Sequence, residues 1–372
     1  MESISHDWKW QIANRIATRE QLEEYIELTE EERAVFDGEL PLSFAVTPHY
    51  ANLTRNSEAL RKTVIPVGAE NNVGTGELAD PLGEEDHRAT PHLIHTYPDK
   101  VLFLATTFCS TYCRYCTRSR MVGKPQLNLE GRVPSRPPSA MNQSEQSPAL
   151  QKYADTFAYI EAHTEIRDVL ISGGDPLTMT DSVLDELLSR VRNIPHIRMV
   201  RIGSKGPVVL PQRITDDLCS ILRKHRVWLS LHFIHADELS PETQEACRKL
   251  SDHGIGMVSQ TVLLKGINDT PEALKDLFYG LLEINVKPYY LLQCDPVQGS
   301  EHFRTTVDKG IELIQSLHGH ICGLAVPQYV IDAPGGGGKV PILGKEQLTR
   351  TAEGVAFKNY LGKEYFYPDQ IG

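Results

Sequence analysis

Three of the seven cysteines lie within one short segment, CSTYCRYC at residues 109–116, directly after an apolar run. Three thiolates on one loop can hold three irons of a 4Fe–4S cluster, which leaves the fourth iron free to bind another molecule. A structural zinc site is the alternative, but such sites normally have four protein ligands, and His92 or His95 would have to be the fourth. We therefore expect Cys109, Cys113 and Cys116 to be the ligands of an iron–sulfur cluster.

A second polar segment ends the next apolar run, at residues 168–174. Gly173 and Gly174 allow the backbone to approach a neighbour closely, and Ser172 and Asp175 add a hydroxyl and a carboxylate. A turn without a ligand is the usual meaning of such a sequence.

A run of four glycines lies between Asp332 and Lys339 in the segment DAPGGGGK. Consecutive glycines lose much backbone entropy on folding, so they are expected where the chain turns sharply or lets a ligand approach. The segment is not a phosphate-binding P-loop, because Val340 follows the lysine. A lysine at a strand end can form an aldimine with pyridoxal phosphate. The alternative is a solvated lysine on a flexible surface turn.

Apolar runs alternate with amphipathic segments from about residue 100 onward. Such alternation predicts a parallel α/β sheet or barrel, partial or full. Thr270 followed by Pro271, and Ser240 followed by Pro241, are typical of helix starts. The predicted strands are 101–107, 168–174, 197–204, 227–234 and 258–264, the predicted helices are 181–194, 214–225, 240–254 and 270–284, and the segments 287–294, 305–319 and 324–332 complete the series.

The chain divides into three parts by composition. Residues 1–95 are polar with short helical patterns and are predicted to form an N-terminal helical region. Residues 96–342 carry the α/β pattern, with one insertion at 124–150 that is rich in Pro, Ser, Gln and Asn and is expected to be mobile. Residues 343–372 form a C-terminal extension with two short strands expected around Gly362.

Charge and hydropathy exclude several classes of protein. The formal net charge of -11 argues against a nucleic-acid backbone as the main partner. No run of about 18 apolar residues predicts a transmembrane helix, so no membrane partner is expected. The first residues lack the apolar core of a secretory signal, so we expect a cytoplasmic protein. An odd, clustered set of cysteines fits a metal or redox site and not a disulfide framework.

The CxxxCxxC segment after the first strand of a βα series resembles the radical S-adenosylmethionine superfamily. Longer segments resemble one family within it, lysine 2,3-aminomutase, and the resemblance covers nearly the whole chain apart from residues 124–150 and the extreme C-terminus. The matching segments are DWKWQ (7–11), TPHY (47–50), HTYPDKVLFL (95–104), CSTYCRYCTRSR (109–120), RDVLISGGDPL (167–177), RIGSKGPVVLPQRI (201–214), QCD (293–295), GSEHFRTTVDKGIE (299–312) and VIDAPGGGGK (330–339).

The resemblance implies a barrel of the radical S-adenosylmethionine type and an isomerase. It also implies three cofactors, which are a 4Fe–4S cluster, S-adenosylmethionine and pyridoxal 5′-phosphate. Such an enzyme would use a 5′-deoxyadenosyl radical to move the α-amino group of L-lysine to the β-carbon through a pyridoxal phosphate aldimine. Its partners would be a free amino acid and an electron donor such as flavodoxin or ferredoxin, and a homo-oligomer stays open.

The resemblance also implies a role for individual residues. Lys339 matches the lysine that binds pyridoxal phosphate, and the three clustered cysteines match the cluster ligands. Arg118 matches the arginine that binds the substrate carboxylate, a task that suits a planar guanidinium. Asp295 and Asp332 match two aspartates that hold the cationic end of lysine. The cofactor contacts are expected from Ser172, Gly173, Gly174 and Asp175, which hold the methionine amino group, and from His232 and Gln260, which lie on strands that line the cofactor site.

The sequence departs from the family pattern at several positions. Thr96 and Lys100 stand where the family has phosphate-binding arginines, and Leu292 replaces an aromatic residue. Thr270 stands where some members have a zinc-binding cysteine, and the cysteine-rich C-terminal tail of those members is missing.

Three other functions remain as alternatives. Arginine or another cationic amino acid would also suit two aspartates, and so would a lysine side chain on a protein, although the CTRSR segment and the long N-terminal region resemble the free-amino-acid enzymes. Glutamate is disfavoured, because the aspartates would repel its γ-carboxylate. A zinc-binding interaction module is the alternative from a different class, and it would purify as a colourless protein under anaerobic conditions where an iron–sulfur protein is brown.

Overall fold

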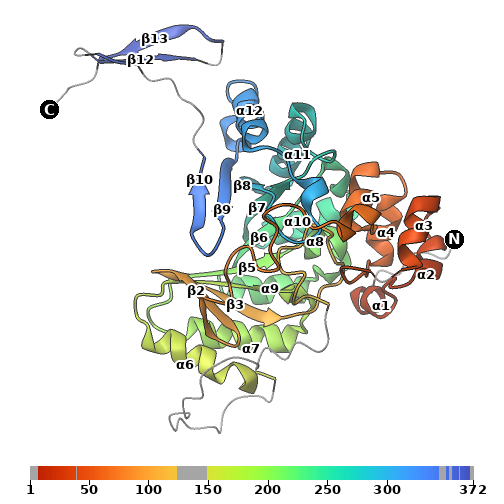
Figure 1. Ribbon diagram of the computed structural model, residues 1–372. Coiled ribbons are helices and arrows are strands. Elements are labelled where there is room, and N and C mark those ends of the chain that lie inside the picture. The colour runs from red at the N-terminus through yellow and green to blue at the C-terminus, as the bar shows by residue number, and fades with distance from the viewer. Residues whose placement is uncertain are drawn as a thin grey trace.

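One large sheet organises the molecule. The computed structural model describes residues 7–38, 40–123, 149–342, 349–351, 354–359 and 361–368. Ten strands pair in the order of the sequence, and β3 to β9 run parallel. Within the described ranges β1 and β10 are the two edges, so the sheet forms a partial barrel (Figure 1). The strands are β1 (Arg88–Thr90), β2 (Leu93–Tyr97), β3 (Lys100–Thr106), β4 (Asp168–Gly173), β5 (Met199–Ser204), β6 (Trp228–His232), β7 (Gly256–Leu263), β8 (Lys287–Gln293), β9 (Gln328–Ala333) and β10 (Gly338–Pro341).

A helix connects each parallel strand to the next. Thr270 and Ser240 accept hydrogen bonds from the backbone N–H groups of Ala273 and Thr243, so both predicted caps are confirmed. The helix that follows β3 was not predicted from the sequence. These helices are α6 (Ala154–Ala162), α7 (Asp181–Arg192), α9 (Asp216–Lys224), α10 (Pro241–Asp252), α11 (Pro271–Glu283) and α12 (Val307–Leu317), with the short α8 (Gly206–Val209) between β5 and α9.

The core lies between the sheet and these helices. In β3, Val101, Phe103 and Ala105 are buried, and the Phe103 ring contacts Phe157 of α6 edge-on. Tyr329 of β9 likewise packs on α12, where a side chain in place of Gly310 would collide with its ring. Because side chains alternate along a strand, the intervening residues face the barrel interior. Side chains that could line a site inside the barrel are therefore those at the strand positions that alternate with the core residues.

Short helices precede the sheet: α1 (Trp8–Ala13), α2 (Arg19–Glu23), α3 (Glu30–Phe36), α4 (Pro48–Thr54) and α5 (Glu58–Val64). They gather on one side of the barrel (Figure 1). The sheet itself begins at Arg88, since β1 and β2 join it by antiparallel pairing, β1 with β2 and β2 with β3. The expected boundary at residue 95 therefore falls inside β2.

The C-terminal residues form a second sheet of three strands, β11 (Thr349–Thr351), β12 (Gly354–Lys358) and β13 (Glu364–Tyr367). The two strands expected around Gly362 are β12 and β13, and β11 was not predicted. The mobile insertion expected at 124–150 lies almost wholly outside the described residues, although Leu150 at its end is fully buried. No helix in the described part of the chain is long and apolar enough to span a membrane.

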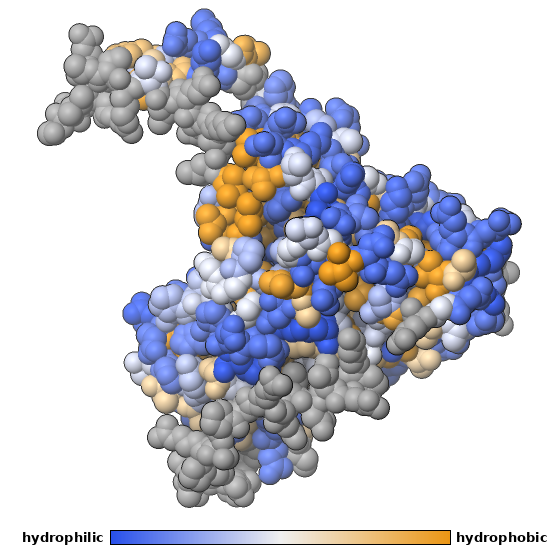
Figure 2. Space-filling model, in the orientation of Figure 1, coloured by the Kyte–Doolittle hydropathy of each residue, from blue (hydrophilic) through white to orange (hydrophobic). Residues whose placement is uncertain are grey.

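An apolar surface patch lies over β9 and β10 (Figure 2). Val340 of the edge strand β10 is 44% exposed. The patch therefore marks the side of the barrel where the sheet ends.

Candidate active site

The three clustered cysteines follow β3, at the carboxyl end of the parallel strands. Burial raises the pKa of all three thiols, well above its usual value for Cys109 and to about 11 for Cys116. The negative charges of Asp175, Cys116 and Cys113 raise the pKa of Cys109 further. Iron binding requires thiolates, and a bound cluster would have to offset this burial.

The three cysteines are not arranged as ligands of a single metal ion. Among the described residues, no group of three or more His, Cys, Asp or Glu side chains is placed to hold a single metal ion. In a 4Fe–4S cluster each cysteine binds a different iron. The donor set, three thiols on one loop, fits such a cluster.

The N-terminal region holds the cysteine loop in place. The Arg15 guanidinium lies over the Phe108 ring, 4.2 Å from its centroid, and its Nη1 donates a hydrogen bond to the Cys109 carbonyl at 2.6 Å. Arg114, inside the cysteine segment, forms a fully buried ion pair with Glu70. Neither Arg15 nor Glu70 was predicted from the sequence, because nothing in their local sequence points to residues about 40 to 90 positions away.

The glycines at the end of β4 are required by this loop. A side chain on Gly173 would collide with the Thr106 carbonyl oxygen, and one on Gly174 with that of Phe108. Gly173 also has φ +114°, which a residue with a side chain rarely adopts. The two glycines therefore let the end of β4 interlock with the start of the cysteine loop, and the close neighbour is protein backbone.

Asp175 is buried and its carboxylate already has protein donors. It accepts hydrogen bonds from the Ser204 hydroxyl at 2.7 and 3.0 Å, from the Lys205 N–H at 3.0 Å and from the Leu177 N–H at 3.0 Å. Burial outweighs these bonds and raises the pKa of Asp175. Asp175 thus ties the end of β4 to the end of β5, and it also raises the pKa of Cys109 nearby.

His232 and Gln260 face each other across β6 and β7. Burial, followed by the positive charges of Lys205, Arg118 and Lys339, lowers the pKa of His232 to about 4. The imidazole is therefore neutral at physiological pH and can accept as well as donate a hydrogen bond. The Gln260 amide nitrogen donates to the Ser230 hydroxyl at 2.5 Å.

Lys339 and Asp332 are directly opposite each other on the β9–β10 hairpin. The Lys339 ammonium donates a short, charged hydrogen bond to the Asp332 carboxylate. The Lys339 N–H donates to the Tyr97 hydroxyl at 2.7 Å, which ties β10 to β2. A side chain on Gly338 would come within 3.0 Å of the Tyr97 ring, so the glycine beside Lys339 is also required by packing.

Asp295 follows β8, and its Oδ2 accepts a hydrogen bond from the Thr117 hydroxyl at 2.8 Å. Burial, together with the negative charge of Asp332, raises the pKa of Asp295 to about 6. Lys339 and Arg118 act in the opposite direction. A pocket between the ends of β8 and β9 is lined by both Asp295 and Asp332.

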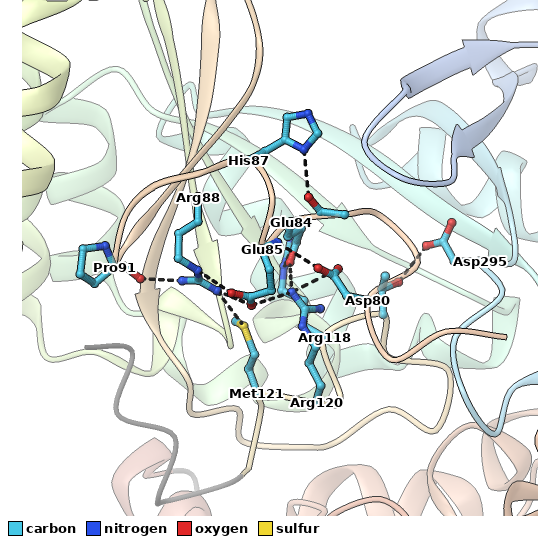
Figure 3. Close-up of polar contacts among 12 residues, drawn as sticks. Asp80, Glu84, Glu85, His87, Arg88, Pro91, Arg118, Arg120, Met121 and Asp295 are labelled. Carbon is cyan, nitrogen blue, oxygen red and sulfur yellow. Dashed lines mark hydrogen bonds and ion pairs between the residues drawn. The ribbon is translucent and has the colours of Figure 1, made fainter. Parts of the chain in front are cut away.

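Arg118 lies two residues beyond Cys116 and is paired with a carboxylate that was not predicted from the sequence. Its guanidinium contacts Glu84 at 2.8 Å, and Arg120 contacts the same carboxylate at 3.1 Å (Figure 3). Asp295 lies apart from this group of charges, beyond the segment that carries Thr117 (Figure 3). The positive charge of Arg118 nevertheless lowers the pKa of Asp295 and of His232, and the negative charge of Asp332 raises the pKa of Arg118.

The site residues predicted from the sequence thus fall into two neighbouring groups at one end of the barrel. Cys109, Ser172, Gly173, Gly174 and Asp175 gather where β3, β4 and β5 end. The second group, near β6 to β10, contains Arg118, His232, Asp295, Asp332 and Lys339. Thr96 and Lys100 lie in β2 and β3, and Lys100 pairs with Asp99 at 3.4 Å.

Comparison with known proteins gives the family. The radical SAM superfamily model matches residues 103–278, and the lysine-2,3-aminomutase model matches residues 314–370. L-lysine 2,3-aminomutase of Clostridium subterminale is 42% identical over 371 residues, which cover 98% of this chain and 85% of that protein. The chain belongs to the lysine 2,3-aminomutase family. The Bacillus subtilis L-lysine 2,3-aminomutase is 41% identical over 98% of this chain and 74% of its own length, and glutamate 2,3-aminomutase of Clostridioides difficile is 35% identical over 98% and 83%.

Membership in the lysine 2,3-aminomutase family makes this protein a radical S-adenosylmethionine isomerase. Its cofactors follow from the family: a 4Fe–4S cluster and S-adenosylmethionine from the superfamily, and pyridoxal phosphate from the aminomutases. The sequence predicted a barrel of the radical S-adenosylmethionine type, partial or full; this is confirmed, and the barrel is a partial one. The zinc-binding interaction module has no support from these relatives.

Proposed function

We propose that this aminomutase moves the amino group of L-lysine between its α- and β-carbons. The observation that carries the proposal is the pair of carboxylates, Asp295 and Asp332, at the ends of two neighbouring strands in one pocket. Two buried carboxylates repel each other unless a cation lies between them. Burial raises the pKa of Asp295, and the negative charge of Asp332 raises it further.

A primary ammonium group is the cation that suits this pocket. The chain's own Lys339 ammonium already binds Asp332, so this carboxylate accepts the same chemical group that ends the lysine side chain. Arg118 would bind the α-carboxylate at the other end of the substrate, because a guanidinium forms paired hydrogen bonds with a carboxylate. The substrate would therefore lie between one cation and two anions.

The remaining site residues would position the cofactors. The bound cluster and S-adenosylmethionine would supply a carbon radical that abstracts hydrogen, and pyridoxal phosphate would carry the migrating nitrogen. Cys109, Cys113 and Cys116 would hold the cluster, and Lys339 would hold pyridoxal phosphate. Cofactor contacts are also proposed for Ser172, Gly173, Gly174, Asp175, His232 and Gln260. The Asp175 carboxylate would have to accept a hydrogen bond from the cofactor in addition to those that it accepts from Ser204 and Lys205.

Further features stay proposals. Enzymes of this superfamily need a reductant, and we propose flavodoxin or ferredoxin for this role. A cytoplasmic location and a homo-oligomer stay predictions, as does the division into residues 1–95, 96–342 and 343–372.

Arginine is the second candidate, because its guanidinium could also lie between Asp295 and Asp332. Glutamate is not favoured, although one relative is named for it, because its γ-carboxylate would approach two carboxylates. The two aspartates therefore separate cationic substrates from acidic ones more sharply than they separate lysine from arginine.

The proposal is tested with reconstituted holoenzyme under anaerobic conditions. Lysine, arginine, ornithine and glutamate are each incubated with reductant, and the α- and β-isomers are separated and identified by mass. We expect β-lysine from lysine and no product from glutamate. Turnover of glutamate, or of none of the cationic substrates, would overturn the proposal.

A further inference from the structure

The Glu84 carboxylate lies between two guanidiniums, those of Arg118 and Arg120, which follow the cysteine segment (Figure 3). Nε of Arg118 donates to Oε1 at 2.9 Å and to Oε2 at 3.2 Å, and Nη2 lies 2.8 Å from Oε1. Nη2 of Arg120 donates to Oε2 at 3.1 Å. Both oxygens of Glu84 are thus engaged by positive charge.

Glu84 occupies only one of the two edges of Arg118. A guanidinium can bind one carboxylate along its Nε–Nη2 edge and another along its Nη1–Nη2 edge. Glu84 takes the first edge, and Nη1 of Arg118 makes no hydrogen bond to any residue that the structure describes. The Arg118 side chain is 22% exposed, whereas that of Glu84 is only 5% exposed, so the open side of this pair belongs to the arginine.

Glu84 is the charged partner of Arg118. Glu84 is ionised, because Arg118 and Arg120 lower its pKa against the opposing effect of burial. Arg120 also pairs with Asp80 and Glu85, each at 3.3 Å, so it does not depend on Glu84 alone for a counter-charge. Among the described residues, Arg118 forms an ion pair with Glu84 alone, so Glu84 fixes the orientation of Arg118.

The segment that carries Glu84 also contacts the hairpin of Lys339. The Gly335 N–H donates a hydrogen bond to the Pro81 carbonyl at 2.9 Å, and a side chain on Gly83 would come within 2.8 Å of the Gly335 carbonyl carbon. One short segment thus contacts both Arg118 and the hairpin that carries the pyridoxal phosphate lysine.

We infer that Glu84 is a positioning residue that holds the Nη1–Nη2 edge of Arg118 toward the substrate α-carboxylate. The inference rests on the proposed role of Arg118 in substrate binding. It assigns to Glu84 a function in aligning the carboxylate end of the amino acid with the reacting centre.

The test is Glu84→Gln in the reconstituted holoenzyme, with Glu85→Gln as the matched control. Glu85 is adjacent, half-exposed and paired with Arg88 and Arg120, but it does not contact Arg118. Removing a negative charge beside Arg118 should strengthen carboxylate binding if charge alone matters. If Glu84 positions Arg118, the KM for lysine should instead rise by about 10-fold to 100-fold, with kcat less affected, and Glu85→Gln should stay near wild type.

A ligand without the carboxylate separates positioning from general damage. The inhibition constant of 1,5-diaminopentane, which keeps the ammonium groups but lacks the α-carboxylate, should be the same in Glu84→Gln and wild type. Equal weakening of lysine and the diamine, an unchanged KM or a lower KM for lysine would each overturn the inference. Iron and pyridoxal phosphate contents near those of wild type show that the variant is folded; if Glu84→Gln fails to fold, Glu84→Asp is measured in the same way.

Arg118→Lys distinguishes failure of this inference from failure of the proposed function. Adding Glu84→Gln to Arg118→Lys should cause no further rise in KM, because the positioned group is already gone. If Arg118→Lys binds lysine like wild type, the proposed role of Arg118 is wrong. If Arg118→Lys is impaired but Glu84→Gln is not, only the role of Glu84 is wrong.

Discussion

The cross-strand pair of Lys339 and Asp332 fixes the position of the Lys339 amine. Their positions are fixed by the β9–β10 register, and the Tyr97 hydroxyl anchors the Lys339 backbone from the other side. The Lys339 side chain is 30% exposed, so its amine is accessible from solvent. These features place a nucleophilic amine beside a carboxylate on a rigid hairpin.

Lys339→Ala should abolish turnover while leaving the cluster intact, because it removes only the amine that, on the proposed function, holds pyridoxal phosphate. Iron content and the absorbance of bound pyridoxal phosphate measure the two effects separately. Lys309→Ala, in helix α12, is the control and should keep full activity. Lysine turnover by the Lys339 variant would contradict the assignment.

Asp295 makes stability depend on pH in an unusual direction. Its folded-state pKa of about 6 lies above the ordinary value of about 3.9. The folded protein therefore binds more protons than the unfolded chain between these values, and stability falls as pH rises through this range. Above pH 6 the full cost of the buried charge is present, and below pH 4 it is absent.

Asp295→Asn should therefore stabilise the cofactor-free protein above pH 6, by about 1 to 2 kcal/mol in the free energy of unfolding. The variant and wild type should converge below pH 4. On the proposed function, the same change should also lower kcat/KM for lysine, by a factor equivalent to about 2 to 5 kcal/mol, because a carboxylate proposed to face the substrate ammonium is lost. Denaturant titrations at pH 4, 6 and 8 test the first expectation, and equal stability of the two proteins at pH 8 would refute it.

The glycine hairpin carries constraints at the level of the element. Gly335, Gly336 and Gly338 all have φ between +74° and +86°, where residues with side chains are strained. Gly336 differs from Gly335, because a side chain there would also collide with the His87 ring. Among the described residues, no atom lies within 4 Å of the place that a Cβ on Gly335 would take.

Gly335→Ala and Gly336→Ala therefore form a matched pair. Gly335→Ala should destabilise the protein by about 1 to 2 kcal/mol through backbone strain alone. Gly336→Ala should cost about 1 to 3 kcal/mol more through overpacking, and it should reduce bound pyridoxal phosphate. Thermal unfolding and cofactor absorbance measure both. His87→Ala should partly rescue Gly336→Ala, and equal losses in the two glycine variants would argue against the packing explanation.

Periodicity predicted most of the repeated elements from β3 to α12, because each of these strands and helices buries one face, and several of the helices have a capping residue such as Thr270. It did not predict α6, which has no side-chain cap, or β1, β2, β10 and β11, which are strands of three to five residues at or next to a sheet edge. Contiguous motifs likewise revealed the cysteines and Lys339. The ion pairs of Glu84 and Glu70 could not be predicted from the sequence, because their partners lie 34 and 44 residues away and an isolated glutamate has no local sequence pattern.

The N-terminal helices and the barrel form one functional unit around the cysteine loop. Arg114 and Glu70 are fully buried, and Arg114 also donates to the Ser43 carbonyl at 2.8 Å. Arg114 lies between two of the cysteines, so this ion pair connects the N-terminal region to the cluster ligands. Removal of one partner would leave an uncompensated buried charge.

Glu70→Gln should lower the free energy of unfolding by about 3 to 5 kcal/mol and reduce iron incorporation. Glu58→Gln, which removes an exposed ion pair with Lys62, should change neither quantity. Denaturant unfolding and iron analysis of the reconstituted proteins measure the effects. Normal iron content in a destabilised Glu70 variant would show that the N-terminal region supports the fold but not the cluster.

The ion pair between Lys339 and Asp332 has a consequence for the order in which the enzyme is loaded. On the proposed function, Lys339 gives up this contact when it takes pyridoxal phosphate, and Asp332 then loses its internal counter-ion. The ammonium group of a cationic amino acid can then become the counter-ion of Asp332. Without the cofactor, Lys339 would compete with lysine for Asp332, so selective binding of cationic over acidic amino acids would require bound pyridoxal phosphate.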